Sequence, residues 1–379
     1  MKKVLLICTA SQSVINFRKN FILELKKNGF EVFVIAFDDS YKPEIEDIGA
    51  NFYSIQDRNR SINPLGILTL CNRYKKIISD IQPDAVFTFM LKPNVFGIQA
   101  ARKSGITNIF AMVEGAGDVF IQNTLKWQFI RKGVCLLYKR AFRNAEKVFF
   151  LNEDDKNEFV VRKLVKGEKC VVIPGIGVNL SHFSYKTLKN DQTFLMIARM
   201  LETKGVLEYC ECARIVKRAY PNAVFNYIGA EGSLTVADIQ QYIDDGSISY
   251  LGTTKDVRPF LEDCTAFVLP SYREGLPMSV MEAEAIGRCI IASDCIGCRD
   301  TVINGYNGFL VPLKDSRMLA EKCLYMIEHK DETSRMAENS RRFAEDHFDQ
   351  MKINQKIMNL TLFEDSSSLS IQSAHLETI

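Results

Sequence analysis

The sequence predicts an α/β fold made of two doubly wound, Rossmann-like domains. Short apolar runs, typical of buried parallel strands, alternate with longer helical segments. This rhythm stops at a polar stretch, residues 184–192, and then restarts, which predicts a domain boundary near residue 188. We therefore expect a first domain over residues 1–188 and a second over residues 189–350. Two such domains facing each other leave a ligand cleft at the carboxyl ends of both sets of strands.

Each expected strand is a short apolar run followed by a helical segment or a turn. The strands predicted before the boundary are residues 3–8, 32–37, 85–89, 108–112, 147–151 and 170–173. Those predicted after it are residues 193–197, 223–228, 248–251, 266–269 and 289–292. The last stretch, residues 365–379, is serine-rich and aperiodic, so we expect it to form a loose tail.

Composition indicates a globular protein of a reducing compartment. The chain has 379 residues, of which 47% are apolar and 25% charged, and no apolar run long enough to cross a bilayer. Its eleven cysteines are scattered, and no signal peptide precedes them, which favours free thiols in the cytoplasm over disulfides. Cys295 and Cys298 form one Cys-x-x-Cys pair, but no second pair follows at the spacing that a structural zinc site needs.

The small net charge of +2 conceals an asymmetry between the two halves. Residues 1–190 carry 29 basic and 18 acidic residues, whereas residues 191–379 carry 19 and 28. A basic first domain is attracted to anionic lipid or to a diphosphate-bearing acceptor. The alternative is that these charges serve solvation alone.

The most informative segment is residues 269–287, where a strand end leads through a glycine turn into a helix. Pro277 suits the first turn of that helix, whose free N–H groups form a site for a phosphate. Glu274 lies in the turn, and Glu282 lies more than one turn into the helix. A carboxylate on either side of the phosphate site predicts that a nucleotide sugar binds here. The alternative is that a carboxylate near a helix start only complements the helix dipole.

This segment resembles the Glu-x7-Glu signature of retaining glycosyltransferase family 4. The similarity spans residues 2–363, and the further motifs that carry it are residues 197–199, 204–205, 228–229, 250–252 and 304–308. It implies the GT-B fold, with a last helix over residues 351–364 crossing back to the first domain. Within the family, the chain is similar to bacterial transferases of N-acetylgalactosamine or related hexoses, which use UDP-sugars and polyprenyl-diphosphate-linked glycans of capsule, O-antigen or glycoprotein assembly.

The resemblance implies roles for individual residues of the second domain. Arg199 and Lys204 would stabilise the departing diphosphate, although two cations after a strand also fit a surface role. Glu274 would contact the donor sugar and Glu282 the ribose. The backbone N–H groups of Gly275 and Leu276 would face the sugar or phosphate. Gly229 would lie beneath the base, although a glycine after a strand is usually only a turn.

The first domain departs from the family pattern in two loops. The loop over residues 9–13 lacks the glycine pair of many relatives, so we expect Ser11, with Asn16 and Arg18 of the next helix, on the acceptor side. The loop over residues 113–118 lacks the histidine of many relatives. Glu114 is the candidate polar group for the reacting sugar and Asp118 is the second. A carboxylate that merely orders a glycine loop is an equal alternative.

The resemblance also bears on mechanism. Retention of anomeric configuration in this family is thought to need no protein nucleophile, because the leaving phosphate can take the acceptor proton on the same face. The sequence contains no Asp-x-Asp pair of the kind that holds a divalent cation, so no cofactor and no essential metal are expected.

Residues 126–147 form a basic and aromatic stretch with the only tryptophan of the chain. Lys126, Trp127, Arg131 and Lys132 suit an anionic membrane surface. We therefore expect a cytoplasmic protein bound peripherally to the inner face of the cytoplasmic membrane. The alternative is a helix packed on the sheet with its lysine side chains reaching the solvent.

Other functions fit the sequence less well. A same-fold epimerase or phosphorylase and a non-catalytic membrane-associated scaffold remain alternatives, although Arg199, Lys204, Glu274 and Glu282 together argue against the scaffold. No nucleic-acid-binding module is recognisable, and the Gly-x-Gly-x-x-Gly dinucleotide motif is absent. The expected partners are therefore a UDP-sugar, a lipid-linked glycan and an anionic membrane surface, with no nucleic acid.

Overall fold

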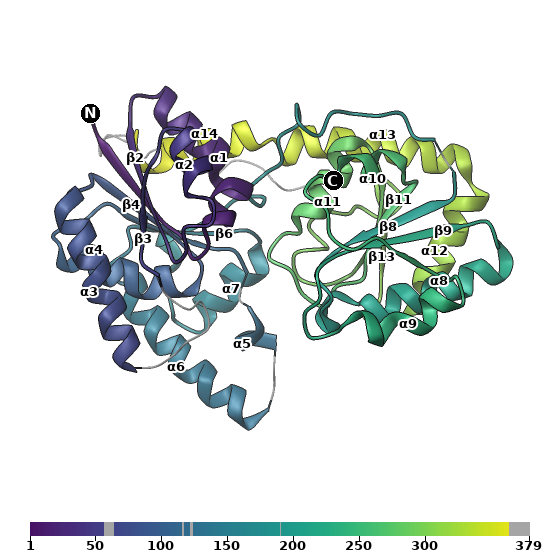
Figure 1. Ribbon diagram of the computed structural model, residues 1–379, viewed down its shortest axis with the longest axis horizontal. Helices are drawn as coiled ribbons and strands as arrows, with labels where there is room; N and C mark the ends of the chain where they lie inside the picture. The colour runs from purple at the N-terminus through teal and green to yellow at the C-terminus, as the bar shows by residue number, and fades with distance from the viewer. Residues whose placement is uncertain (57–63, 116, 122–123, 190, 364–379) are drawn as a thin grey trace.

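Two parallel sheets, each covered by helices on both faces, make up the protein, as the sequence predicts (Figure 1). A computed structural model describes residues 1–56, 64–115, 117–121, 124–189 and 191–363. The expected tail over residues 365–379 lies outside these residues. The predicted boundary, residue 188, falls between the last strand of the first sheet and the first strand of the second.

The first sheet has seven strands in the order β3-β2-β1-β4-β5-β6-β7, all paired in parallel. Its strands are β1 (Lys3–Ile7), β2 (Glu31–Ala36), β3 (Asn51–Ser54), β4 (Ala85–Phe89), β5 (Ile109–Val113), β6 (Lys147–Phe150) and β7 (Cys170–Val172). Its helices are α1 (Ser11–Lys27), α2 (Lys42–Asp47), α3 (Pro64–Ile81), η1 (Pro93–Gly97), α4 (Ile98–Lys103), α5 (Asp118–Ile121), α6 (Leu125–Phe142), α7 (Glu153–Val161) and η2 (Gly167–Lys169).

The second sheet has six strands in the order β10-β9-β8-β11-β12-β13, also parallel. Its strands are β8 (Thr193–Ile197), β9 (Val224–Ile228), β10 (Ser249–Tyr250), β11 (Ala266–Leu269), β12 (Cys289–Ser293) and β13 (Gly308–Val311). The helices are η3 (Glu202–Lys204), α8 (Val206–Ala219), α9 (Val236–Asp244), α10 (Arg258–Asp263), α11 (Met278–Ile286), α12 (Ser316–Glu328), α13 (Lys330–His347) and α14 (Gln350–Thr361).

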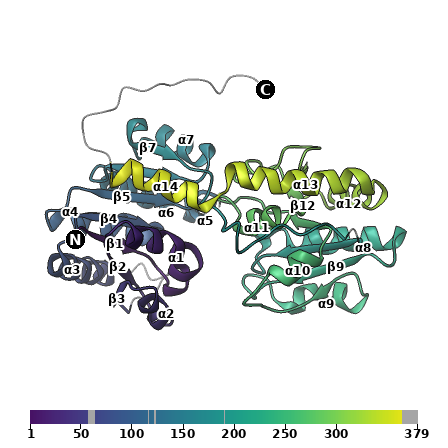
Figure 2. The same cartoon turned by 90° about the horizontal axis from the view of Figure 1, so that it is seen from above.

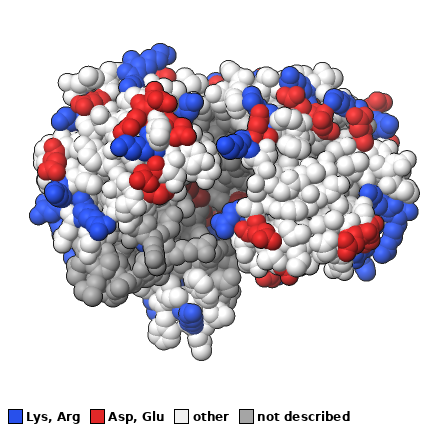
Figure 3. All heavy atoms as spheres, in the orientation of Figure 1, with Lys and Arg blue, Asp and Glu red and all other residues white. Residues whose placement is uncertain are grey.

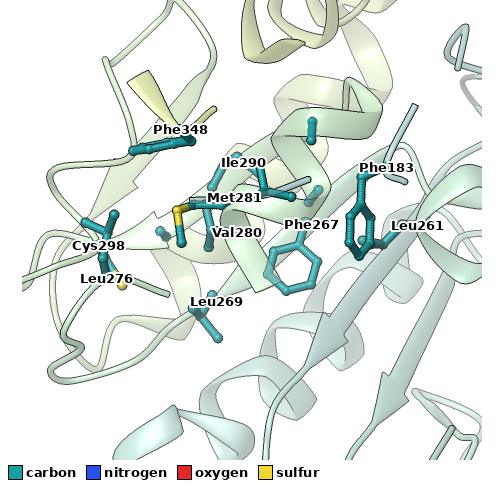
Figure 4. Close-up of a cluster of buried hydrophobic side chains, with 14 of the residues drawn as sticks. Phe183, Leu261, Phe267, Leu269, Leu276, Val280, Met281, Ile290, Cys298 and Phe348 are labelled. Atoms are coloured by element: carbon teal, nitrogen blue, oxygen red, sulfur yellow. The ribbon is translucent and has the colours of Figure 1, made fainter. Parts of the chain in front are cut away.

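The central strands are apolar throughout because helices bury both faces of each sheet. Every residue of β4, β5, β11 and β12 is buried. Two strands, β3 and β13, are not among those that the apolar runs predict. Their apolar runs are short, residues 52–53 in β3 and residues 309–311 in β13, so they give a weak strand signal. The core of the second domain gathers around α11, where Val280 and Met281 pack near Leu269 and Ile290 (Figure 4).

The C-terminal helices join the two domains. Helix α13 covers the second domain, and α14 continues onto the first, where it packs against α1 (Figure 2). The crossing is fixed by backbone bonds to the segment between the sheets: Val178 N–H donates to Phe348 O at 2.8 Å, and Gln350 N–H donates to Val178 O at 3.2 Å. Asn20 of α1 also donates to the Gln350 side chain.

Gly177 makes this crossing possible, so Gly177→Ala is expected to destabilise the protein. Gly177 has φ +74°, and a Cβ atom there would lie 2.6 Å from Cα of Gln350. The left-handed backbone alone costs alanine about 1–2 kcal/mol, to which the displaced helix adds. We expect the melting temperature to fall by several degrees. A Cβ atom added at Gly167 would meet no other atom within 4 Å, so Gly167→Ala is the matched control. Equal melting temperatures for the two variants would contradict the argument.

Candidate active site

A furrow separates the two domains, with acidic and basic side chains along its walls (Figure 3). The loop that the sequence singles out, between β11 and α11, lies on the second-domain side of this furrow. Helix α11 begins at Met278, so Pro277 is its N-cap rather than its first residue. Val280 N–H already donates to Pro277 O at 3.1 Å, so among the described residues the N–H groups of the first turn that remain for an anion are those of Met278 and Ser279.

Lys204 and Glu274, 70 positions apart in the chain, meet in this loop. Lys204 Nζ donates to Glu274 Oε1 at 2.5 Å, and both side chains are largely buried. The turn that carries Lys204 ends at Gly205, where φ is +73° and the carbonyl oxygen of Pro270 leaves no room for a Cβ atom. The structure therefore holds the predicted cation and the predicted carboxylate in contact.

Arg199 precedes Lys204 by five residues and is exposed. It follows β8 and, within the described part of the chain, its guanidinium has no hydrogen-bond or ion-pair partner. An arginine without a partner at the end of a central strand is available to bind an incoming anion.

Glu282 lies in the second turn of α11 and is partly buried. Burial raises the pKa of Glu282 to about 8. Its neighbour Glu284 is fully buried, and burial raises the pKa of its carboxyl well above the usual value, although Asn307 Nδ2 donates to it at 2.7 Å. Sequence reasoning did not single out Glu284, whose partner Asn307 belongs to the motif at residues 304–308.

The remaining predicted residues of the donor side serve packing in this structure. Leu276 is buried against Gly175, where a Cβ atom would lie 2.7 Å from Leu276 Cδ2. Gly229 donates its N–H to Gly252 O at 2.8 Å and accepts from the Tyr250 hydroxyl at 2.9 Å. These bonds already use the polar backbone groups of Gly229, so its place beneath a base stays a prediction.

Gly275 lies where the two domains touch. The carbonyl oxygen of Glu114, from the first domain, occupies the space that a Cβ atom of Gly275 would need. The carbonyl of Gly275 in turn accepts from Asn152 Nδ2 of the first domain at 2.5 Å. The loop over residues 113–115 and the donor loop therefore meet backbone to backbone.

The Glu114 carboxylate forms an ion pair with Arg18 of α1. Arg18 is buried with its guanidinium 4.2 Å from the centre of the Phe89 ring, and burial lowers the pKa of Arg18 to about 10. Both predicted residues thus lie beside the furrow in one cluster. The pairing fits a carboxylate that orders the loop, and contact with a reacting sugar stays a prediction. The side chain of Asp118 lies outside the described residues.

The other predicted residues of the acceptor side differ in exposure. Ser11 is fully buried, donates to Asp38 and accepts the N–H of Tyr41 at 3.1 Å, so its hydroxyl shapes the loop after β1. Asn16 is exposed on α1. Lys126 and Lys132 are exposed on α6, whereas Trp127 and Arg131 are partly buried.

Several neighbours of Glu274 were not expected from the sequence. Arg273 pairs with Asp155 and Glu158 of α7, and Asn152 contacts Gly275. The available signal was the acidic run that follows the strand at residues 147–151.

All eleven cysteines are free, and Cys295 and Cys298 are buried under the donor loop. Among the described residues, no three His, Cys, Asp or Glu side chains gather as a metal site.

Two Rossmann-like domains, with a lysine–carboxylate pair and a helix start on the second-domain side of the furrow between them, are the arrangement of a GT-B sugar transferase. Residues 178–343 match the model of the group 1 glycosyl transferases, and residues 3–152 match that of the glycosyl transferase 4-like domains. The chain belongs to this glycosyltransferase family, as its motifs indicate.

Relatives with assigned names share most of the chain. It is 33% identical over 345 residues to the N,N'-diacetylbacillosaminyl-diphospho-undecaprenol alpha-1,3-N-acetylgalactosaminyltransferase of Campylobacter jejuni, covering 87% of this chain and 91% of that protein. It is 29% identical over 262 residues to the UDP-Gal:alpha-D-GlcNAc-diphosphoundecaprenol alpha-1,3-galactosyltransferase of Escherichia coli, covering 63% of this chain and 65% of that protein.

Solved structures share the fold. Anabaena Alr3699/HepE in complex with UDP and glucose superposes with a TM-score of 0.79 at 18% identity, covering 95% of this chain and 99% of that one. The sucrose-phosphate synthase of Thermosynechococcus elongatus gives a TM-score of 0.78 at 17% identity, covering 95% and 98%.

The raised pKa of Glu282 predicts how a Glu282→Gln variant responds to pH. With a folded pKa of about 8 and an unfolded value of roughly 4.3, the neutral carboxyl contributes stability that is complete in acid and is lost as the pH rises through 8. Glutamine does not ionise. We therefore expect the melting temperature of the variant to exceed that of the wild type by more at roughly pH 8 than at roughly pH 5. If the melting temperatures of the variant and the wild type differed by the same amount at both pH values, the prediction would be contradicted.

Proposed function

We propose that this glycosyltransferase moves a hexose, such as N-acetylgalactosamine or galactose, from UDP to a polyprenyl-diphosphate-linked glycan, with retention of configuration. The names of the Campylobacter and Escherichia relatives support the acceptor class, and the second of them also names a UDP-sugar donor. A further relative is a capsular polysaccharide biosynthesis glycosyltransferase of Staphylococcus aureus, 25% identical over 229 residues. These names support a role in the assembly of a bacterial surface glycan.

The observation that carries the proposal is the Lys204–Glu274 pair, with Arg199, which has no partner among the described residues, five positions before Lys204. Arg199, Lys204 and the N–H groups at the start of α11 bind the diphosphate of the donor. As the glycosidic bond breaks, negative charge grows on the leaving phosphate, and cations fixed in a poorly solvated furrow stabilise it.

The carboxylates orient the sugar and the nucleoside. Glu274 accepts hydrogen bonds from hydroxyl groups of the donor sugar, while Glu282 accepts from the ribose diol. The acceptor hydroxyl attacks on the face from which the phosphate leaves, and a phosphate oxygen takes its proton. No protein nucleophile takes part. Because side chains and helix N–H groups supply the positive charge, we expect no essential metal.

The Glu274→Gln variant tests the donor site. Release of UDP in the presence of a polyprenyl-linked acceptor is expected to fall on the order of a hundredfold, the scale of losing one aligned polar group at a reacting centre. Glu338→Gln, an exposed carboxylate on α13, is the matched control and should leave the rate unchanged. Full activity of Glu274→Gln would refute the site, and loss of wild-type activity in EDTA would refute metal independence.

We also propose that α6 binds the inner face of the cytoplasmic membrane. Its outer face carries Leu125, Phe129 and Leu136, which are exposed to 75%, 72% and 68%, in one stripe with Lys132. The helix projects below the rest of the first domain in Figure 1, and basic side chains mark this projection in Figure 3. A helix that served packing alone would keep such large apolar side chains buried.

A basic groove beside the stripe supports the same proposal. It has a volume of about 550 Å³ and is lined by Gln128, Arg131, Lys132, Cys135 and Arg162. Three cations in one groove suit the phosphates of a lipid headgroup or of the lipid-linked acceptor. Arg131 Nε also donates to Val119 O at 2.8 Å, which ties the groove to the segment after Glu114. Among the described residues, no helix combines the length and apolar composition needed to span a bilayer.

Vesicle sedimentation tests the membrane proposal. The protein should sediment with vesicles rich in phosphatidylglycerol, less so as salt rises, and little with phosphatidylcholine vesicles. A Leu125→Ser, Phe129→Ser double variant is expected to lose roughly tenfold or more in vesicle affinity, because two large apolar groups no longer insert. Ile303→Ser, an exposed apolar site on the second domain, is the control. Equal recovery in the supernatant with both vesicle types would refute the proposal.

A further inference from the structure

The two residues that flank Glu274 are both bonded to the first domain. Arg273 Nη2 donates to Glu158 Oε2 at 2.8 Å and to Asp155 Oδ1. Gly275 O accepts from Asn152 Nδ2 at 2.5 Å. Glu274 therefore sits on a peptide that the opposite domain holds at both ends, while its own N–H donates to Ile296 O of the second domain at 2.9 Å.

The first-domain side of this contact is rigid. Asn152 is the N-cap of α7, and its Oδ1 accepts the N–H of Asp155 at 2.7 Å. Its Nδ2 also lies 3.2 Å from Asp155 Oδ2. Because only two residues separate β6 from α7, the cap and the carboxylate are fixed to the end of a buried strand. The groups that reach across the furrow are thus preorganised.

The contact is charged and buried. The side chain of Asp155 is completely buried, and that of Arg273 keeps only 13% of its exposure. Burial raises the pKa of Asp155 and Arg273 opposes that rise, so the charged carboxylate needs its arginine. A partly open furrow would leave one charge desolvated and unpaired, which is costly, so separated and closed domains are favoured over intermediates.

A neighbouring pair provides the contrast. Arg299 of the second domain approaches Asp154 of α7 at 3.6 Å, but both side chains are exposed to about 40%. An exposed pair of this kind contributes little. Asp154 lies one residue from Asp155 on the same helix, so removing the charge of Asp154 is a close control for removing that of Asp155.

We propose that Asn152, Asp155 and Arg273 are positioning residues that fix the Glu274 carboxylate against the donor sugar only when the domains close. The proposal rests on the assignment of Glu274 to the donor sugar. It makes the acceptor-binding domain part of the donor site, because the first domain completes the geometry of a second-domain glutamate.

The test separates turnover from nucleotide binding. In Asp155→Asn, kcat should fall on the order of tenfold to a hundredfold, as expected for a misplaced reacting group. The Kd for UDP, measured by titration calorimetry, should change by no more than about twofold, because the diphosphate site lies in the second domain. Asp154→Asn should leave both quantities within about twofold of the wild type.

Arg273→Gln leaves the cap of α7 intact and serves if Asp155→Asn folds poorly. It should lower kcat by a similar factor, and the double variant should be no worse than the more damaged single variant, because both changes remove one interaction. Equal losses of kcat and UDP affinity, additive losses in the double variant, or an equal effect of Asp154→Asn would overturn the proposal.

The control for the underlying assignment is Glu274→Gln. If that variant loses activity while Asp155→Asn and Arg273→Gln retain it, the positioning role alone is refuted. If Glu274→Gln stays active, the donor-site assignment fails, and the positioning role that rests on it fails as well.

Discussion

Backbone meets backbone where the domains close, and this contact sets the geometry of the furrow. The carbonyl of Glu114 lies where any side chain at position 275 would begin, so only glycine lets the loops approach. Gly297 imposes a similar steric constraint on the donor loop, since a Cβ atom there would lie 2.6 Å from Glu274 O. The donor loop is therefore layered between two segments that tolerate no extra atoms. A glutamate carried by such a loop has little freedom to relocate.

Charge pairing within the furrow complements this steric constraint. Without a donor, Lys204 and Glu274 satisfy each other, and Arg18 satisfies Glu114. Neither acid is left unpaired in a poorly solvated place, which would be costly. Arg199 remains without a partner among the described residues. The proposed donor diphosphate would therefore meet one available cation, Arg199, and one, Lys204, that is already paired with Glu274.

The sequence predicts much of this arrangement, and the exceptions have physical reasons. Central strands such as β5 and β11 appear as apolar runs of five and four residues, whereas β3 and β13 contain runs of only two and three. The glycosyltransferase motifs identify Lys204 and Glu274 as candidates, but the contact between them appears only in three dimensions. Arg273 and Asp155 are 118 positions apart, and a pair at such a distance leaves no periodic trace in one sequence. Both are charged side chains that would fit a solvated surface equally well, so their residue types alone do not indicate the pairing.

The interface between the domains also changes how the charge asymmetry is interpreted. Opposite net charges on the two halves suggest simple attraction, and Lys186 pairs with Glu262 in that sense, yet the salt bridges between α7 and the second domain run the other way. Acidic residues of the basic domain, Asp154, Asp155 and Glu158, pair with Arg273 and Arg299 of the acidic one. These pairs consume acidic side chains of the first domain, so the surface it still exposes is more basic than its total charge indicates. The excess of exposed basic side chains on the first domain remains available to an anionic partner. Some of these side chains lie on α6 next to its stripe of exposed apolar residues.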